Sequence, residues 1–111
     1  MIKVGDVVKW KSQAGGIEKE KQGIVVAFVP KGTRGAYKVL AKVLGIETNN
    51  LPKSRIKFQD INIAYDRAIV EVRRGGKSKV ADYYAPSVNL LRIVDYAAEN
   101  TSHFNGGDER Q

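Results

Sequence analysis

The stretch VGDVVKWKSQAGGIEKEKQGIVVAFV, residues 4–29, decides the fold of this chain. Its first apolar run alternates, so that Val8 and Trp10 fall on one face of a strand and Lys9 and Lys11 fall on the other. The glycines and charged residues that follow are typical of a solvated turn. A second apolar run completes the pattern of a β-hairpin.

The second run, residues 24–29, is apolar at both alternating sets of positions. Such a strand is either buried on both faces or curls across a barrel. Pro30 is expected to end it, because proline cannot donate to the ladder.

The hydrophobic period then changes to that of a helix. Residues 33–44 are predicted to form one α-helix, with Thr33 as its N-cap and Gly45 ending it in a left-handed conformation. The apolar positions at helical spacing are Ala36, Leu40, Val43 and Leu44.

The second half of the chain returns to strand patterns. Residues 55–65 alternate with a change of phase at Asp60, which predicts a bulge or a bend. Residues 67–74 and 80–86, joined by a Gly-Gly loop, predict a second hairpin. After Pro86, a tight helical turn is expected to lead into a last strand.

Length and composition fit a single domain. The chain has 111 residues, 42% of them apolar, and no run approaches the roughly 20 apolar residues of a transmembrane helix. Residues 95–111 are polar and lack a period, which predicts a mobile tail after a domain of residues 1–94. The absence of cysteine excludes disulfides and thiolate chemistry and is compatible with the reducing cytoplasm.

Charge is unevenly distributed along the chain. Residues 1–94 hold 18 Lys and Arg against 8 Asp and Glu, whereas residues 95–111 hold one against four. A basic body attracts polyanions through its long-range field and through counterion release. The pattern favours nucleic acid or a nucleoprotein complex as the partner, although surplus lysine also keeps small proteins in solution.

The order of these elements resembles that of SH3-like small β-barrels of the KOW and Tudor types. The opening GDVVKW, the long GIVVAFVP, and APSVNLL at the place of the 3₁₀ turn before the final strand carry the resemblance. It covers residues 4–30 and 67–94, and the helical segment at residues 33–50 is an insertion. More loosely, the chain is similar to short uncharacterised proteins of bacteriophages and mobile elements.

The resemblance implies a mainly β fold, an antiparallel barrel of about five strands with one inserted helix at about residues 33–44. Barrels of this kind are mostly binding modules, and the fold does not fix what they bind.

Residues able to carry catalysis are scarce. His103 is the only histidine, and it falls in the predicted tail, where acid–base geometry could not be held. Glu18 and Glu20 alternate with lysines, as on a solvated face. No metal-ligand spacing, phosphate loop or dinucleotide fingerprint is present. The sequence therefore predicts no enzyme, no metal and no cofactor.

Binding chemistry is represented by three basic clusters, on the first strand, in KSRIK and around the Gly-Gly loop of RRGGKSK. Arginine and lysine in such clusters contact phosphates, but each cluster also fits a solvated edge that deters strand pairing. The candidate binding residues are Lys9, Lys11, Lys53, Arg55, Lys57, Arg73, Arg74, Lys77 and Lys79.

Aromatic residues add a candidate stacking contact. Tyr83 and Tyr84 are adjacent on a strand, so they point to opposite faces. The outward one, taken as Tyr84, is a candidate for stacking on a base or packing on a peptide. Trp10 shares a face with Val8 and is predicted to lie in the core.

The sequence thus predicts a cytoplasmic, non-enzymatic, basic barrel that binds nucleic acid or a nucleoprotein complex, with no membrane partner. The alternative is a protein–protein interaction module, such as a phage-encoded, anti-CRISPR-like inhibitor of a host defence complex. In that case the inserted helix and the barrel edge would dock on the target.

Overall fold

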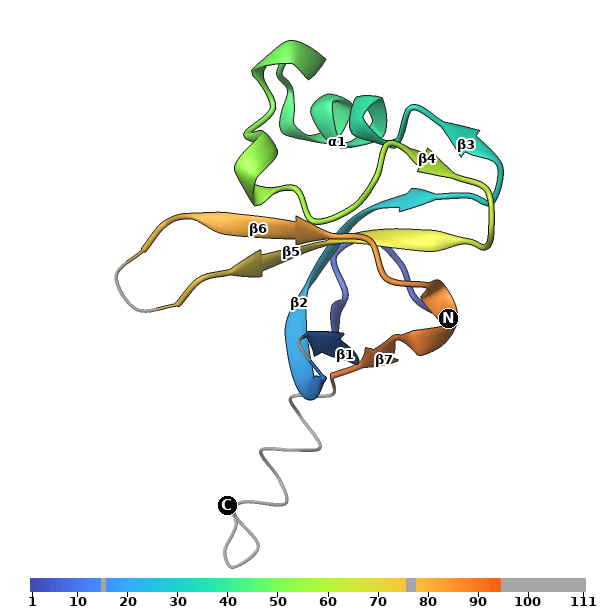
Figure 1. Cartoon of the computed structure of the whole chain (residues 1–111), viewed down its shortest axis with the longest axis vertical. Helices are drawn as coiled ribbons and strands as arrows, with labels where there is room; N and C mark the ends of the chain where they lie inside the picture. Colours follow the sequence, from blue (N-terminus) through green and yellow to red (C-terminus); the bar gives the residue numbers. More distant parts are fainter. Residues whose placement is uncertain (15, 76–77, 95–111) are drawn as a thin grey trace, which may run out of the picture.

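Five strands form one antiparallel sheet, in the order β6-β5-β2-β1-β7 (Figure 1). The computed structural model describes residues 1–14, 16–75 and 78–94. The strands are β1 (Val7–Ala14), β2 (Ile17–Val29), β5 (Arg67–Arg73), β6 (Ala81–Tyr84) and β7 (Arg92–Ile93). The predicted mainly β class with one helix is confirmed, and so are both predicted hairpins, β1–β2 and β5–β6.

β5 is buried on both faces of the sheet. Ile69 faces one core together with Leu40 of the helix, whereas Ala68 and Val70 face a second core with Val8 and Trp10. These six side chains are at most 3% exposed. The predicted core position of Trp10 is therefore confirmed.

β2 contributes to both cores because a bulge interrupts it. The pairing with β5 shifts register between Val25 and Ala27. Side chains alternate with a period of two, so one extra residue moves the buried set to the other face. Val25 accordingly lies in the core of Trp10, whereas Ala27 and Val29 lie in the core under the helix.

The sequence left open whether β2 is buried on both of its faces, and the structure shows that it is not. Ile24 is 40% exposed and Phe28 is 37% exposed, since nothing among the described residues covers them fully. The strand therefore curls past two cores instead of being buried on two sides throughout.

An inserted segment between β2 and β5 covers one face of the sheet (Figure 1). It contains β3 (Thr33–Arg34), α1 (Ala36–Leu44), the 3₁₀ turns η1 (Thr48–Asn50) and η2 (Lys53–Arg55), and β4 (Ile61–Asn62), which pairs with β3. Ala36, Leu40 and Ala41 place the buried face of α1 on the sheet.

α1 begins later than predicted and has a different cap. Gly35, at φ 99°, is the N-cap, and the Thr33 hydroxyl donates to the Pro30 carbonyl at 2.7 Å instead. Asp60 satisfies the helix start from a distance, because its carboxylate and carbonyl oxygens accept from the Tyr37 and Ala36 amides, each at 2.7 Å. The predicted left-handed end at Gly45 is confirmed by its φ of 71°.

The strand expected over residues 55–65 is reduced to the two residues of β4. Ile56 and Phe58 pack on the core under α1 instead of continuing an alternating ladder. Asn62 then turns inward and is 3% exposed. The sequence alternates here because side chains of an irregular segment pack on the core. Hydrophobic periodicity alone does not distinguish such a segment from a strand.

Asn62 holds the inserted segment to the sheet. Its side-chain amide donates to the carbonyl oxygens of Val29, Pro30 and Tyr65 at 2.9–3.2 Å, and its Oδ1 accepts from Arg67 Nε at 3.0 Å. Buried polar groups are costly when their partners are lost.

Replacement of Asn62 by alanine is therefore expected to lower the free energy of unfolding by about 2–4 kcal/mol. Urea unfolding followed by circular dichroism measures this loss. Asn49→Ala, at an exposed position of η1, is the matched control and should leave stability unchanged. Equal stability of the two variants would contradict a structural role for Asn62.

The predicted helical turn before the last strand is present as η3 (Val88–Leu90). Within the residues that the structure describes, no helix combines the length and apolar character needed to cross a membrane. The predicted tail at residues 95–111 lies outside them.

Candidate functional site

Two basic clusters that are distant in the sequence meet at β6. On the outer edge of β6, Ile56 forms a bridge to Tyr83, and the Lys57 amide donates to the Tyr83 carbonyl at 2.8 Å. On its inner edge, β6 pairs with β5 in the hairpin that projects from the sheet (Figure 1). The segments that these contacts join carry six described cations, here called the β6 basic surface: Lys53, Arg55, Lys57, Arg73, Arg74 and Lys79. Arg73 pairs with Ala81 of β6 and also lines a pocket with Gly23 of β2.

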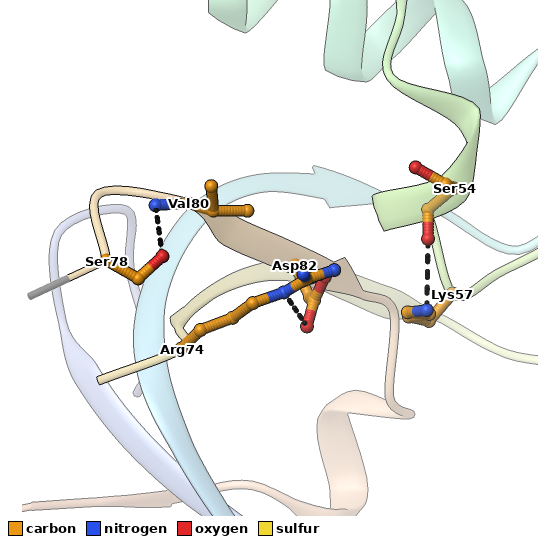
Figure 2. A network of polar contacts seen from close by, with 6 residues as sticks. All are labelled: Ser54, Lys57, Arg74, Ser78, Val80 and Asp82. Carbon is orange, nitrogen blue, oxygen red and sulfur yellow. Dashed lines mark hydrogen bonds and ion pairs between the residues drawn. The ribbon is translucent and has the colours of Figure 1, made fainter. Parts of the chain in front are cut away.

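An ion pair joins the two strands of the hairpin where they enter its loop. Arg74 Nη2 lies 2.8 Å from Asp82 Oδ1, and Arg74 Nε lies 3.2 Å from each oxygen of the same carboxylate (Figure 2). This hydrogen bonding raises the pKa of Arg74 and lowers the pKa of Asp82, although burial of Asp82 opposes part of its shift. Lys57 and Arg55 also lower the pKa of Asp82, so cations from both clusters act on one carboxylate.

The other cations of the surface face solvent. Lys53, Lys57, Arg73 and Lys79 are exposed and Arg55 is half-buried. Lys57 Nζ donates to the Ser54 carbonyl at 3.0 Å, and the Ser78 hydroxyl accepts from the Val80 amide at 3.1 Å (Figure 2). Both bonds are local, so they shape the two segments without neutralising their charge.

Asp82→Asn is expected to weaken the fold at pH 7 and to make it less sensitive to acid. Because the folded-state pKa of Asp82 is lowered, its ionised form stabilises the fold above the unfolded-state pKa of about 3.9. That contribution is lost as the pH falls through the lower folded-state pKa. The difference between the unfolding temperatures of wild type and variant should therefore shrink from pH 7 to pH 2.

Glu47→Gln, an exposed position on another loop, is the control for this prediction. A difference for Asp82→Asn that stays constant with pH, or that equals the control, would contradict the coupling between Asp82 and Arg74.

The third predicted cluster is not part of this surface. Lys9 and Lys11 lie on β1, which β2 and β5 separate from β6 in the sheet. Lys11 Nζ is 3.8 Å from Glu18 Oε1, and Lys11 lines a shallow groove with Leu90 and Arg92. Lys77, also predicted as a site residue, lies outside the described residues.

The adjacent tyrosines do point to opposite faces, but neither stands free. Tyr83 is buried and its hydroxyl donates to Glu71 Oε2 at 3.2 Å, and burial, followed by Glu71, raises its pKa. Tyr84 packs edge-on against Trp10 at 5.9 Å between ring centroids. Lys21 Nζ lies 4.8 Å from the Tyr84 ring centroid. Tyr84 is thus already engaged by Trp10 and Lys21.

Two cations that the sequence analysis did not single out take part in defined contacts. Lys21 covers Tyr84, and Arg67 lies with Lys57 in the wall of a pocket. Neither was predicted, because Lys21 alternates with glutamates as on a solvated face, Arg67 stands apart from other cations, and only the fold brings them to their partners.

The described residues hold no group of three or more His, Asp or Glu side chains that could bind a metal. The candidate site is therefore defined by positive charge and by its position at the edge of the sheet. No protein-family model, curated protein or solved structure gives a match to this chain.

Proposed function

We propose that this protein is a non-enzymatic binding module that contacts nucleic acid, alone or within a nucleoprotein complex, through the β6 basic surface. The observation that carries this proposal is the meeting of two separate basic clusters around β6, with Asp82 influenced by cations from both. Clustered Lys and Arg that face solvent neutralise phosphates and release counterions.

We also assign the fold to the SH3-like class of small barrels as part of this proposal. Its support is the strand order β6-β5-β2-β1-β7 and the 3₁₀ turn η3 directly before β7. The curl of β2 at its bulge gives the sheet the bend that such barrels need.

The protein-docking alternative also has one observation in its favour. Ile61, Ile63 and Tyr65 are 54%, 62% and 47% exposed on the segment that leads from the insertion to β5. Apolar side chains gathered on one exposed segment are a common feature of protein interfaces.

Salt dependence of binding separates the two functions. Fluorescence anisotropy of a labelled random-sequence oligonucleotide, in single-stranded and duplex form, is measured from 50 to about 300 mM salt. Each phosphate contact contributes roughly 0.7–0.9 to the slope of log K against log salt, so about five contacts predict a slope near −4. No binding at the lowest salt, or binding with a flat salt dependence, would contradict the nucleic-acid proposal and favour protein docking.

A further inference from the structure

A second, smaller site lies at the end of the β6 basic surface. Here a pocket of about 230 Å³ opens between the inserted segment and the start of β5. Its lining residues are Lys57, Phe58, Gln59, Ile61, Arg67 and Ala85. Pockets for drug-sized ligands occupy roughly 300–1,000 Å³, so this one has room for a single chemical group or the end of a chain.

Arg67 is held rigidly in the wall of this pocket by neutral partners. Its Nε donates to Asn62 Oδ1 at 3.0 Å and its Nη1 donates to the Ala85 carbonyl at 2.7 Å. Its guanidinium carbon lies 4.8 Å from the Tyr65 ring centroid. These contacts use two of the five N–H donors of the guanidinium and leave the Nη2 donors for a ligand.

No carboxylate lines the pocket, although Lys57 also acts on Asp82 outside it. Among the described residues, neither Arg67 nor Lys57 forms an ion pair, and the lining contains no acidic side chain. Asp66 and Arg67 together line a second pocket, where Asp66 Oδ1 accepts from the Lys31 amide at 2.8 Å, but Asp66 does not line this one. A partly buried arginine without a counter-charge favours the binding of an anion.

We propose that this pocket binds a phosphate group. Two cations match the charge of a phosphate monoester, about −1.5 to −2 at pH 7, better than the single charge of a carboxylate. The Gln59 amide supplies a neutral donor for a further oxygen, and Ile61 with Phe58 forms the apolar wall for the carbon atoms attached to it. The site is distinct from the β6 basic surface, with which it shares only Lys57.

The first test uses inorganic phosphate and the full chain. Backbone and side-chain amide resonances are followed by NMR during a titration at constant pH, with sodium chloride added to keep the ionic strength constant. Saturable shifts at Gln59 and at the residues around Arg67, with a dissociation constant in the millimolar range, are expected. Shifts that are linear in phosphate, or scattered over all basic residues, would overturn the proposal.

Substitution of Arg67 would also disturb the fold, because Arg67 donates to the buried Asn62. The second test therefore uses variants at the rim of the pocket. Gln59→Glu puts a carboxylate in the pocket at an exposed position and is expected to weaken phosphate binding at least tenfold. Lys42→Gln, at an exposed position of α1 outside both the pocket and the β6 basic surface, is the matched control and should leave phosphate binding unchanged. Equal binding by the wild type and Gln59→Glu would overturn the proposal.

The source of the phosphate is resolved by two oligonucleotides that differ only in a 5′-phosphate. Tighter binding of the phosphorylated one, lost in Gln59→Glu, would place a strand end in the pocket. Equal binding of both, with inorganic phosphate still saturable, would assign the pocket to a small phosphorylated compound. If neither oligonucleotide binds while inorganic phosphate does, the proposed nucleic-acid function fails and the phosphate site stands.

Discussion

Reversal of four charges on the β6 basic surface is expected to reduce affinity for an oligonucleotide at least a hundredfold while leaving the fold intact. The changes are Arg55→Glu, Lys57→Glu, Arg73→Glu and Lys79→Glu. Each replaces an attraction to phosphate by a repulsion, and long-range fields add over the surface. Arg74 is left in place because its loss would free the Asp82 carboxylate inside the hairpin.

A variant with the same net charge but other positions is the control for this reversal. Its four exposed positions, away from β6, are Lys19→Glu, Arg34→Glu, Lys38→Glu and Lys42→Glu. It should lose only the general electrostatic attraction, about tenfold or less. Anisotropy measures both affinities, and circular dichroism checks that both variants are folded. Equal losses in the two variants would show that net charge, and not the β6 basic surface, determines binding.

Gly23→Ala is expected to lower the free energy of unfolding by about 3 kcal/mol or more. Gly23 lies in β2 where this strand passes from its pairing with β1 to its pairing with β5. A Cβ atom there would overlap the Glu71 carbonyl oxygen and lie 2.8 Å from Val70 Cγ1. The backbone of β5 cannot move away without opening both cores, because β5 is buried on both faces.

Gly32→Ala separates this steric effect from backbone strain. Gly32 has φ 91° and no atom within 4 Å of an added Cβ. Only the left-handed conformation should be penalised, at roughly 1–2 kcal/mol. Urea unfolding gives both losses, and a smaller loss for Gly23→Ala than for Gly32→Ala would contradict the close passage of β2 over β5.

The regular parts of the fold follow from the sequence pattern. Alternation places Val8 and Trp10 in the core, the Gly-Gly loop joins β5 to β6, and Gly45 ends α1. These features depend on residues close together in the chain, where period and turn chemistry are informative.

The irregular parts depend on contacts that no local pattern contains. Asp60 caps α1 from 23 residues away, which is why Thr33 is not the N-cap. Asn62 stands in an alternating run, yet it is buried by its bonds to three carbonyl oxygens. Neither contact changes the hydrophobic period, so the helix start and the strand over residues 55–65 were both predicted wrongly.

The candidate site likewise has one part that the sequence predicts and another that depends on contacts between distant residues. Composition identifies the basic clusters, because Lys and Arg are dense there whatever the fold. That the KSRIK cluster lies beside the hairpin, while Lys9 and Lys11 do not, depends on the bridge between Ile56 and Tyr83. The pocket at Arg67 likewise requires three separate segments to converge.

The most direct test of the β6 basic surface is the salt dependence of duplex binding after each cluster is neutralised separately. One variant carries Lys53→Gln, Arg55→Gln and Lys57→Gln, a second carries Arg73→Gln and Lys79→Gln, and a third combines all five. If both clusters contact the same nucleic acid, the slope of log K against log salt should flatten by about 2–3 in the first variant and by about 1–2 in the second. In the third variant these changes should add, leaving almost no dependence on salt. A slope that stays at the wild-type value in either single-cluster variant would contradict a shared surface.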